Sequence, residues 1–204
     1  MGENRAESVG DRHRSGLEGL FSSLGGLNQP AKPRPVEKWN PPFCGDLDMR
    51  IASDGTWFYL GTPIGRLALV KLFASILRKD PERYVLVTPV ERVGITVEDV
   101  PFQAVEMAVT ARDGHDMLTF RTNVDDVVAA GPEHPLRFDG GVLTGLKPYV
   151  HVRGDLWARL TRPLLYDLVE RGEERMVDGV QTLGVTSGGV FFPMAPARDI
   201  QDLA

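Results

Sequence analysis

The chain repeats itself at a fixed offset of 100 residues. The stretch 54–64 (DGTWFYLGTPI) aligns without a gap to 154–164 (GDLWARLTRPL), so that Trp57 matches Trp157 and Pro63 matches Pro163. Self-similarity at a fixed offset is the signature of a repeated structural unit. We therefore expect Trp57 and Trp157 to anchor the cores of two units at equivalent positions. Residues that differ between the copies are candidates for specialised functions.

A second match follows at an offset of 90, where VGIT at 93–96 faces LGVT at 183–186. Each copy thus contains a strand or hairpin, then a helix, then further strands. The sequence predicts an α+β fold of two lobes built from this duplicated unit, with a long β-hairpin between the copies.

The chain divides into three predicted segments. Residues 1–40 read as an N-terminal tail that ends in a proline-rich linker, 41–123 as the first repeat lobe plus the β-hairpin, and 124–204 as the second repeat lobe. The first 16 residues are polar, and we expect no fixed structure there. Apolar residues then recur at helical spacing, which favours a short amphipathic helix able to dock on a protein partner: Leu17, Leu20, Phe21, Leu24 and Leu27.

Local signals in the first copy predict a hairpin and a long helix. Asp54-Gly55, between 49–53 and 56–60, is typical of a type I′ turn. Thr62 at the N-cap and Pro63 at the first helical position predict a helix over 63–79. Strands are expected at 84–87 and 91–97.

The rest of the chain is predicted from the same kinds of signal. A long hairpin joins 102–111 to 116–122 through a turn at 112–114, and Asn123 caps a short helix over 124–130, with two aspartates in its first turn. The second copy supplies a strand at 148–153, a helix at 163–171, and strands near 176–180, 183–186 and 190–193.

Charge and cysteine content limit the class of protein. The formal net charge is −5, which does not suit a nucleic-acid binder. No apolar run reaches the length of a membrane span. Cys44 is the single cysteine, so an intrachain disulfide is excluded, and we expect a buried structural thiol in a cytoplasmic protein.

A polar strand face distinguishes the second copy from the first. Residues on a strand alternate between faces, so one face of 147–153 carries a cation, a phenol, an imidazole and a guanidinium where the first copy has mainly apolar residues. Arg121 and Asn123 alternate in the same way, and His134 and Arg137 follow in a rigid loop. The predicted ligand-binding set is Arg121, Asn123, His134, Arg137, Lys147, Tyr149, His151 and Arg153.

These residue types suit a phosphate attached to an aromatic ring. The alternative interpretation is the solvated outer face of a half-buried sheet. The chain has four scattered histidines and lacks a nucleophile elbow, a Walker-type loop and any metal-ligand spacing. We therefore predict no catalytic residues, no metal and no cofactor.

Several longer motifs resemble a known bacterial family. They are WNPPFCGD at 39–46, GTPIGR at 61–66, TFRTN at 119–123, HPLRF at 134–138, KPYVHVR at 147–153 and SGGVFFP at 187–193. On these motifs, the chain is similar to the domain-of-unknown-function family twelve-eighty-five from residue 39 to 194. The resemblance implies a two-domain α+β fold with repeated motifs. It also implies a cleft between the domains that holds a nucleotide-like ligand in signalling.

Taken together, the residues favour a non-catalytic, cytoplasmic ligand-binding protein with a signalling or regulatory role. Its ligand is expected to be a small anionic or nucleotide-like molecule, and neither nucleic acid nor membrane is an expected partner. Two alternatives remain open: a hydrolase or transferase acting on the same ligand, and an interaction adaptor without a small ligand.

Overall fold

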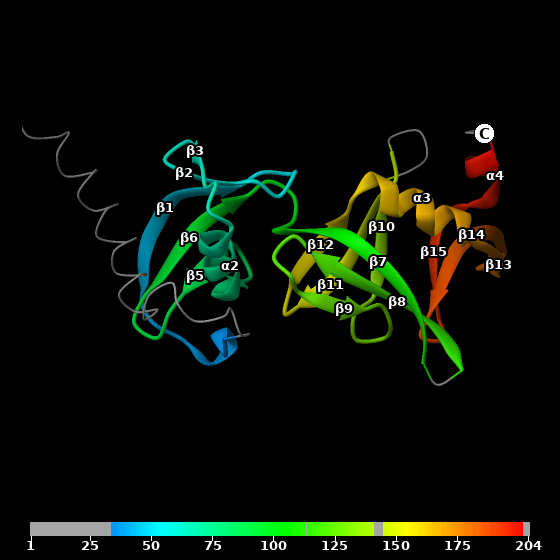
Figure 1. The fold of residues 1–204 in the computed structure, drawn as a ribbon, viewed down its shortest axis with the longest axis horizontal. Helices are drawn as coiled ribbons and strands as arrows, with labels where there is room; N and C mark the ends of the chain where they lie inside the picture. The colour runs from blue at the N-terminus through cyan, green and yellow to red at the C-terminus, as the bar shows by residue number, and fades with distance from the viewer. Residues whose placement is uncertain (1–33, 113, 141–144, 202–204) are drawn as a thin grey trace, which may run out of the picture. The chain divides into compact units, whose positions relative to one another are not determined.

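The computed structural model describes residues 34–112, 114–140 and 145–201, and the predictions for the segment 1–33 lie outside them. The chain is mostly β-structure, in two compact units that divide between Asp99 and Val100 (Figure 1). The predicted two-domain organisation is correct. The helical share is smaller than an α+β class implies.

The described part of the first unit holds one six-stranded sheet, in the order β3-β2-β1-β6-β5-β4, that curls around a short helix (Figure 1). Its elements are η1 (Val36–Lys38), β1 (Phe43–Ile51), β2 (Trp57–Tyr59), β3 (Thr62–Pro63), α2 (Leu67–Ser75), β4 (Leu77–Lys79), β5 (Tyr84–Val87) and β6 (Arg92–Val97). Trp57 of β2 stacks on Phe73 of α2, with ring centroids 6.2 Å apart. This contact forms part of the core of the unit.

The described part of the second unit holds two sheets, one in the order β10-β11-β12-β7-β8-β9 and one in the order β13-β14-β15. Its elements are β7 (Phe102–Arg112), β8 (His115–Thr122), β9 (Val127–Ala129), β10 (Leu136–Asp139), β11 (Lys147–Arg153), β12 (Leu156–Leu160), α3 (Arg162–Glu170), β13 (Glu173–Val177), β14 (Val180–Ser187), β15 (Val190–Pro196) and α4 (Ala197–Gln201). The buried Ser187 hydroxyl joins the two sheets: it accepts from Leu118 N (2.8 Å) and donates to Ala130 O (2.7 Å).

The domain boundary differs from the sequence prediction. The prediction placed the 102–122 hairpin with the first lobe and began the second lobe after Asn123. In the structure, β12 pairs in parallel with β7, with Ala158 opposite Phe102. The hairpin therefore forms the middle of the larger sheet of the second unit.

The two repeated hairpins correspond in register. Ile51 lies opposite Trp57 in the β1–β2 pair, and His151 lies opposite Trp157 in the β11–β12 pair. A helix follows each hairpin. The later strands are used differently, because β6 joins β1 in one sheet, whereas β13, β14 and β15 form a sheet of their own. Duplication of the whole unit stays a prediction.

The turn between β1 and β2 is not of the predicted type. Of the Asp54-Gly55 pair, only Gly55 has a positive φ, at 83°. The Gly55 N–H donates to Ala52 O and the Ala52 N–H donates to Thr56 O, both at 2.9 Å. This is a type I turn followed by a left-handed glycine, which also closes a hairpin.

The predicted helix over 63–79 is wrong at both ends. Thr62 pairs with Tyr59 in a second tight hairpin, and the Ile64 N–H donates to Trp57 O at 2.7 Å. The helix α2 begins only at Leu67, and residues 77–79 form strand β4 beside β5. A continuous apolar run suits a buried strand as well as a helix, and sheet pairing decided between them here.

The predicted helix over 124–130 is absent; the chain there makes a turn and then strand β9. Asp125 has a φ of 68°, outside the helical region. The Thr122 hydroxyl accepts from the Val124 and Asp126 N–H groups at 3.3 and 3.0 Å. Asn123, the expected cap, instead accepts from the Gln103 N–H at 3.0 Å.

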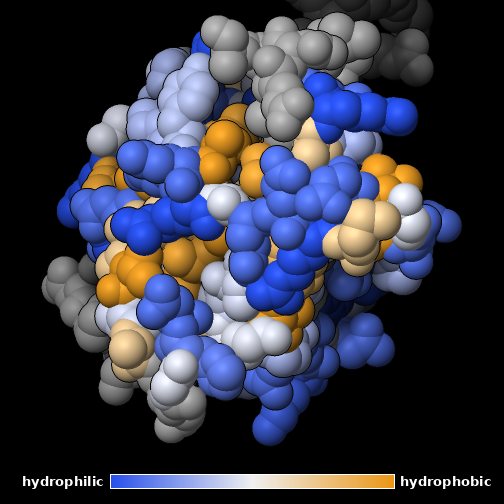
Figure 2. Space-filling view, turned by 90° about the vertical axis from the view of Figure 1, so that its right-hand side faces the viewer, coloured by the Kyte–Doolittle hydropathy of each residue, from blue (hydrophilic) through white to orange (hydrophobic). Residues whose placement is uncertain are grey.

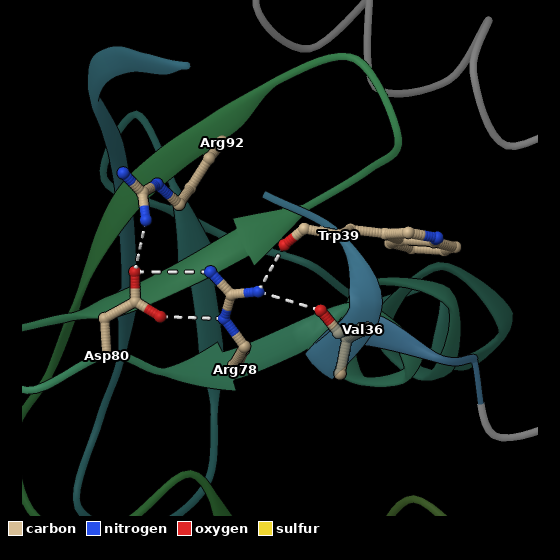
Figure 3. A network of polar contacts seen from close by, with 5 residues as sticks. All are labelled: Val36, Trp39, Arg78, Asp80 and Arg92. Carbon is tan, nitrogen blue, oxygen red and sulfur yellow. Dashed lines mark hydrogen bonds and ion pairs between the residues drawn. The ribbon is translucent and has the colours of Figure 1, made fainter. Parts of the chain in front are cut away.

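Two further expectations for the first unit need correction. Cys44 is exposed, with its thiol directed to Pro42 O at 3.6 Å, so it is not a buried structural cysteine. The last residues of the predicted tail pack on the unit: Val36 is buried, and the Arg78 guanidinium donates to Val36 O and Trp39 O at 2.8 and 2.7 Å (Figure 3).

Candidate functional site

Four polar residues alternate along β11, as the sequence predicts. Lys147 is exposed, Tyr149 is buried, and His151 and Arg153 are half-buried, while the intervening valines are buried. Strands β10 and β12 flank β11 in antiparallel pairs. Directly paired residues of antiparallel strands share a face, so the residues opposite Tyr149 and His151 lie on the same face.

Arg137 of β10 lies over two aromatic rings on this face. Its guanidinium carbon is 4.7 Å from the Tyr149 ring centroid and 4.6 Å from the Trp157 ring centroid. A cation over an aromatic ring is attracted by the negative face of the ring. The Arg137 Nε also lies 3.2 Å from the Asp139 carboxylate, and both of these side chains are partly exposed.

Two histidines extend the same group of side chains. The rings of His134 and His151 stack with centroids 5.7 Å apart, and His151 meets the edge of Trp157 at 5.2 Å. His134 Nδ1 donates to the carbonyl oxygen of His151 at 3.1 Å. We call His134, Arg137, Tyr149, His151 and Trp157 the arginine–aromatic cluster.

Both ring nitrogens of His151 face carbonyl oxygens. Nδ1 lies 3.1 Å from Glu133 O, and Nε2 is in short contact with Gly154 O. Carbonyl oxygens only accept hydrogen bonds, so a neutral ring can donate to one of them at a time. These two contacts hold the ring against Trp157.

Arg121 is occupied by carboxylates and is not a free cation. Its Nε and Nη2 form a two-pronged contact with Glu106, and its Nη1 donates to Asp125 at 2.9 Å. The hydrogen bond to Glu106 is the largest cause of the raised pKa of Arg121, and the same bond lowers the pKa of Glu106. The pair is therefore ionised and mutually neutralised.

Arg153 is likewise held by its own chain. Its Nη1 pairs with Asp126, and its guanidinium carbon lies 5.1 Å from the Phe102 ring centroid. Arg121, Arg153 and Asn123 therefore have partners within the chain, and their part in one ligand site with the other five residues stays a prediction. Lys147 remains beside the cluster, because it lies opposite Asp139 in the register that also places Arg137 opposite Tyr149.

Trp157 is the residue of the cluster that sequence reasoning missed. Because both copies contain this tryptophan, it was interpreted as a core anchor. Trp157 is half-buried on the polar face, whereas Trp57 is 1% exposed. The position of Trp157 opposite His151 could have revealed it, because directly paired residues of antiparallel strands share a face.

The cluster lies apart from the hollow found on another side of the same sheet. That hollow, of about 600 Å³, is lined by Met107, Val109, Asp167, Glu170 and Arg171 and includes none of the eight predicted residues.

On the face with β13–β15, hydrophobic groups are separated by hydrophilic ones (Figure 2). Exposed large apolar side chains of the second unit include Tyr166 of α3, Met176 of β13 and Val180 of β14.

The described residues contain no group of three or more His, Cys, Asp and Glu residues placed to hold a metal ion. None of their helices is long and apolar enough to cross a membrane.

Comparison with known families decides the identity of the chain. Residues 34–100 match the N-terminal domain and residues 101–194 the C-terminal domain of DUF1285, proteins of unknown function. The chain belongs to the DUF1285 family. This is the family that its motifs resemble, and the border between the DUF1285 domains agrees with the division into two compact units.

Two solved structures of DUF1285 proteins are similar to this chain, and the first of them supports the fold. A DUF1285 family protein from Silicibacter pomeroyi DSS-3 is 46% identical with a TM-score of 0.79, over 89% of this chain and 97% of that chain. A DUF1285 family protein from Shewanella baltica OS155 is 30% identical with a TM-score of 0.49, over 61% of this chain and 91% of that chain. No curated protein matches the chain.

Proposed function

We propose that this DUF1285 protein is a non-catalytic ligand-binding protein that holds a small anion attached to a flat ring on the arginine–aromatic cluster of its second unit. The observation that carries the proposal is the position of Arg137, within 4.7 Å of two aromatic ring centroids. A nucleotide-like molecule fits this chemistry. The signalling role implied by the family resemblance would follow from binding at this face.

The arginine–aromatic cluster can contact both parts of such a ligand, the anionic group and the flat ring. Arg137 and the exposed Lys147 supply charge for a phosphate or carboxylate. The half-buried Trp157 supplies a surface on which a ring can stack. Tyr149 is buried beneath Arg137 and orients it.

The existing ion pair between Arg137 and Asp139 is weak enough for a ligand to displace it. Asp139 is 3.2 Å away, and both side chains are nearly half exposed. Exposed ion pairs of this kind contribute about 0–1 kcal/mol. A charge-assisted hydrogen bond to a ligand anion is worth about 1.5–3 kcal/mol, so the ligand competes successfully with Asp139.

A thermal-shift assay with a panel of nucleotides tests the proposal. A ligand at about 100 times its Kd adds about 2.7 kcal/mol of stability, and stacking on Trp157 should also change its fluorescence. Turnover of the bound nucleotide would replace the proposal by the enzyme alternative. A panel without any shift would favour the adaptor alternative.

Variants locate the bound ligand. Arg137→Ala should weaken binding by about ten- to a hundredfold. Arg162→Ala is the matched control, because Arg162 also lies over an aromatic ring, Tyr166, in the same unit but on α3. Equal affinity of wild type and Arg137→Ala would contradict the proposed site.

A further inference from the structure

Strand β7 has an open edge over most of its length. β12 pairs with β7 only as far as Ala104, whose carbonyl then accepts from the Thr161 N–H at 3.1 Å just before α3 begins. On its other side, β7 stays paired with β8 up to Arg112. The β7–β8 hairpin accordingly extends beyond the end of β12 (Figure 1). Among the described residues, no strand pairs with β7 on the β12 side beyond Ala104.

The hydrogen bonds of β8 show which backbone groups of β7 point out from this edge. The Leu118 N–H donates to the Ser187 hydroxyl and the Leu118 carbonyl accepts from the Ala130 N–H, both at 2.8 Å, so both groups of Leu118 face away from β7. Hydrogen-bonded and non-hydrogen-bonded pairs alternate along antiparallel strands. Val109 lies opposite Leu118. The N–H and carbonyl of Val109 therefore point away from β8, toward the open edge.

A second pair of the same ladder confirms this alternation. The Asp116 carbonyl accepts from the Gly188 N–H at 2.9 Å and so faces away from β7, and Asp116 lies opposite Ala111. Met107, Val109 and Ala111 therefore all present their N–H and carbonyl groups at the open edge. Alternate residues of a strand are about 7 Å apart, which is the spacing at which an added strand presents its own backbone groups.

The edge is accessible and lacks the usual protection. From Val105 to Ala111, every residue is exposed or half-buried. The same stretch contains no proline and no lysine, with which natural proteins commonly block the edges of sheets. Its one charged side chain, Glu106, is bound to Arg121 of β8. An exposed, mostly apolar edge of this kind is a template for another strand.

The hollow of about 600 Å³ lies along this edge. Met107 and Val109 of β7 form one wall, and Asp167, Glu170 and Arg171 at the C-terminal end of α3 form the other. Its volume falls within the range of roughly 300–1,000 Å³ that is usual for ligand pockets. An extended peptide in the hollow would thus have the open backbone groups and an apolar wall on one side, and charged groups on the other.

The charged wall of the hollow favours a basic partner. Asp167, Glu170 and Arg171 are all exposed and together carry one net negative charge. None of the three forms an ion pair with another described residue. Exposed charges of this kind contribute little affinity. They therefore select among peptides, while backbone hydrogen bonds hold the peptide on the edge.

We propose that the open edge of β7 is a docking site for an extended, basic segment of a partner protein, which adds a strand to the sheet. The backbone groups of Met107, Val109 and Ala111 bind the backbone of that segment. Its apolar side chains contact Met107 and Val109, and its basic side chains face Asp167 and Glu170. The site lies on β7 and α3 and does not depend on the arginine–aromatic cluster of β10, β11 and β12.

Titration with a synthetic peptide, followed by the amide NMR signals of the protein, tests this site. The probe is a capped hexapeptide in which lysine, valine and lysine alternate with three threonines, so that one face carries the apolar and basic side chains. We expect saturable shifts at Met107, Val109 and Ala111. Two copies of the peptide, each N-methylated at one alternate set of amides, should differ, because only one set pairs with β7. Absence of shifts at the edge, or equal binding of both copies, overturns the proposal.

A proline variant separates backbone pairing from side-chain contact. Val109→Pro removes an N–H that points out from the edge and leaves the hydrogen bonds to β8 in place, a position at which strands tolerate proline. It should weaken peptide binding by about fivefold or more. Val109→Thr is the matched control, because it keeps the N–H and nearly the same side-chain shape. Circular dichroism checks that both variants fold, and unchanged affinity in folded Val109→Pro contradicts strand addition.

A charge variant leaves β7 intact, in case proline disturbs its folding. Glu170→Lys should weaken binding of the lysine peptide by roughly two- to fivefold and strengthen binding of a copy with glutamate in place of lysine. Asp155→Lys is the matched control, because Asp155 is an exposed carboxylate of the same unit that does not line the hollow. Equal effects of the two variants contradict the assigned charge selection.

Sedimentation velocity over a range of protein concentrations tests the other possible occupant, a second copy of this chain. A partner segment requires that the peptide binds to the monomer. Self-association that Val109→Pro abolishes, without any binding of the peptide, overturns the proposal and assigns the edge to pairing between copies.

Discussion

The two hairpin tryptophans hold matching positions and have opposite surroundings. Trp57 lies opposite Ile51, is 1% exposed and stacks on Phe73 of α2. Trp157 lies opposite His151, is half-buried and contacts Arg137. The difference teaches that a hairpin signal determines backbone pairing, whereas burial of its faces depends on what packs against them. Helix α2 packs on its own hairpin, whereas α3 contacts β7 and β14.

The largest expected effect tests this contrast directly. Trp57→Ala should lower the free energy of unfolding by about 3–5 kcal/mol, because it opens a cavity in a packed core. Trp157→Ala should cost about 1 kcal/mol, the ordinary loss for a position that is only half-buried. Urea unfolding followed by circular dichroism measures both. Equal losses would show that the two tryptophans are equivalent anchors after all.

A buried and an exposed arginine network give the next contrast. Arg78→Met in the first unit leaves two carbonyls without their donor and leaves the Asp80 carboxylate with Arg92 alone, and should cost about 1–3 kcal/mol. The same variant should expose residues 36–39 to proteolysis. Arg121→Met in the second unit removes a solvent-exposed contact to Glu106 and Asp125 and should cause no measurable loss. A larger loss for Arg121→Met would reverse the comparison.

The smallest expected effect is an opposite pH dependence of two glutamates. Burial raises the pKa of Glu91 in the first unit above its ordinary value of 4.5. A hydrogen bond from Thr186, aided by Arg175, lowers the pKa of Glu173 in the second unit below the same value. The stability linked to Glu91 therefore falls as the pH rises above 4.5 through the raised pKa. The stability linked to Glu173 falls as the pH drops below 4.5 through the lowered pKa.

Single glutamine variants measure these two dependences. Glu91→Gln should abolish the decline on the alkaline side, and Glu173→Gln should abolish the decline on the acid side. Urea unfolding of both variants between about pH 3 and pH 7 follows the change. Dependences of the same sign in the two variants would contradict the assigned causes.

The elements that the sequence predicts well depend on local chemistry. Strand β5 has the predicted bounds, and the β7–β8 hairpin turns where predicted. The signal for the strand lies in its own residues, and the signal for the hairpin lies in the glycine of its own turn. The helix over 63–79 failed because its apolar residues also suit strand pairing, and β4 pairs with β5.

The errors at the candidate site have a single origin. Asp125 and Asp126 were assigned to the first turn of a helix, where the dipole explained their charge. In the structure, they follow a turn and bind Arg121 and Arg153. A wrong local element thus concealed the partners of two predicted cations. Tyr149, His151 and Arg137 do meet, because strand alternation and hairpin register bring them to one face.

The sequence alone determined the family, the bounds of β5 and the alternating polar residues of β11, because residue patterns and alternation act over a few neighbouring positions. Only the tertiary structure decided which face of each hairpin a helix covers and which cations are already paired. These outcomes depend on residues far apart in the chain, such as Val36 with Arg78 and Asp80 with Arg92. Their energies exist only once the sheets have brought these groups into contact.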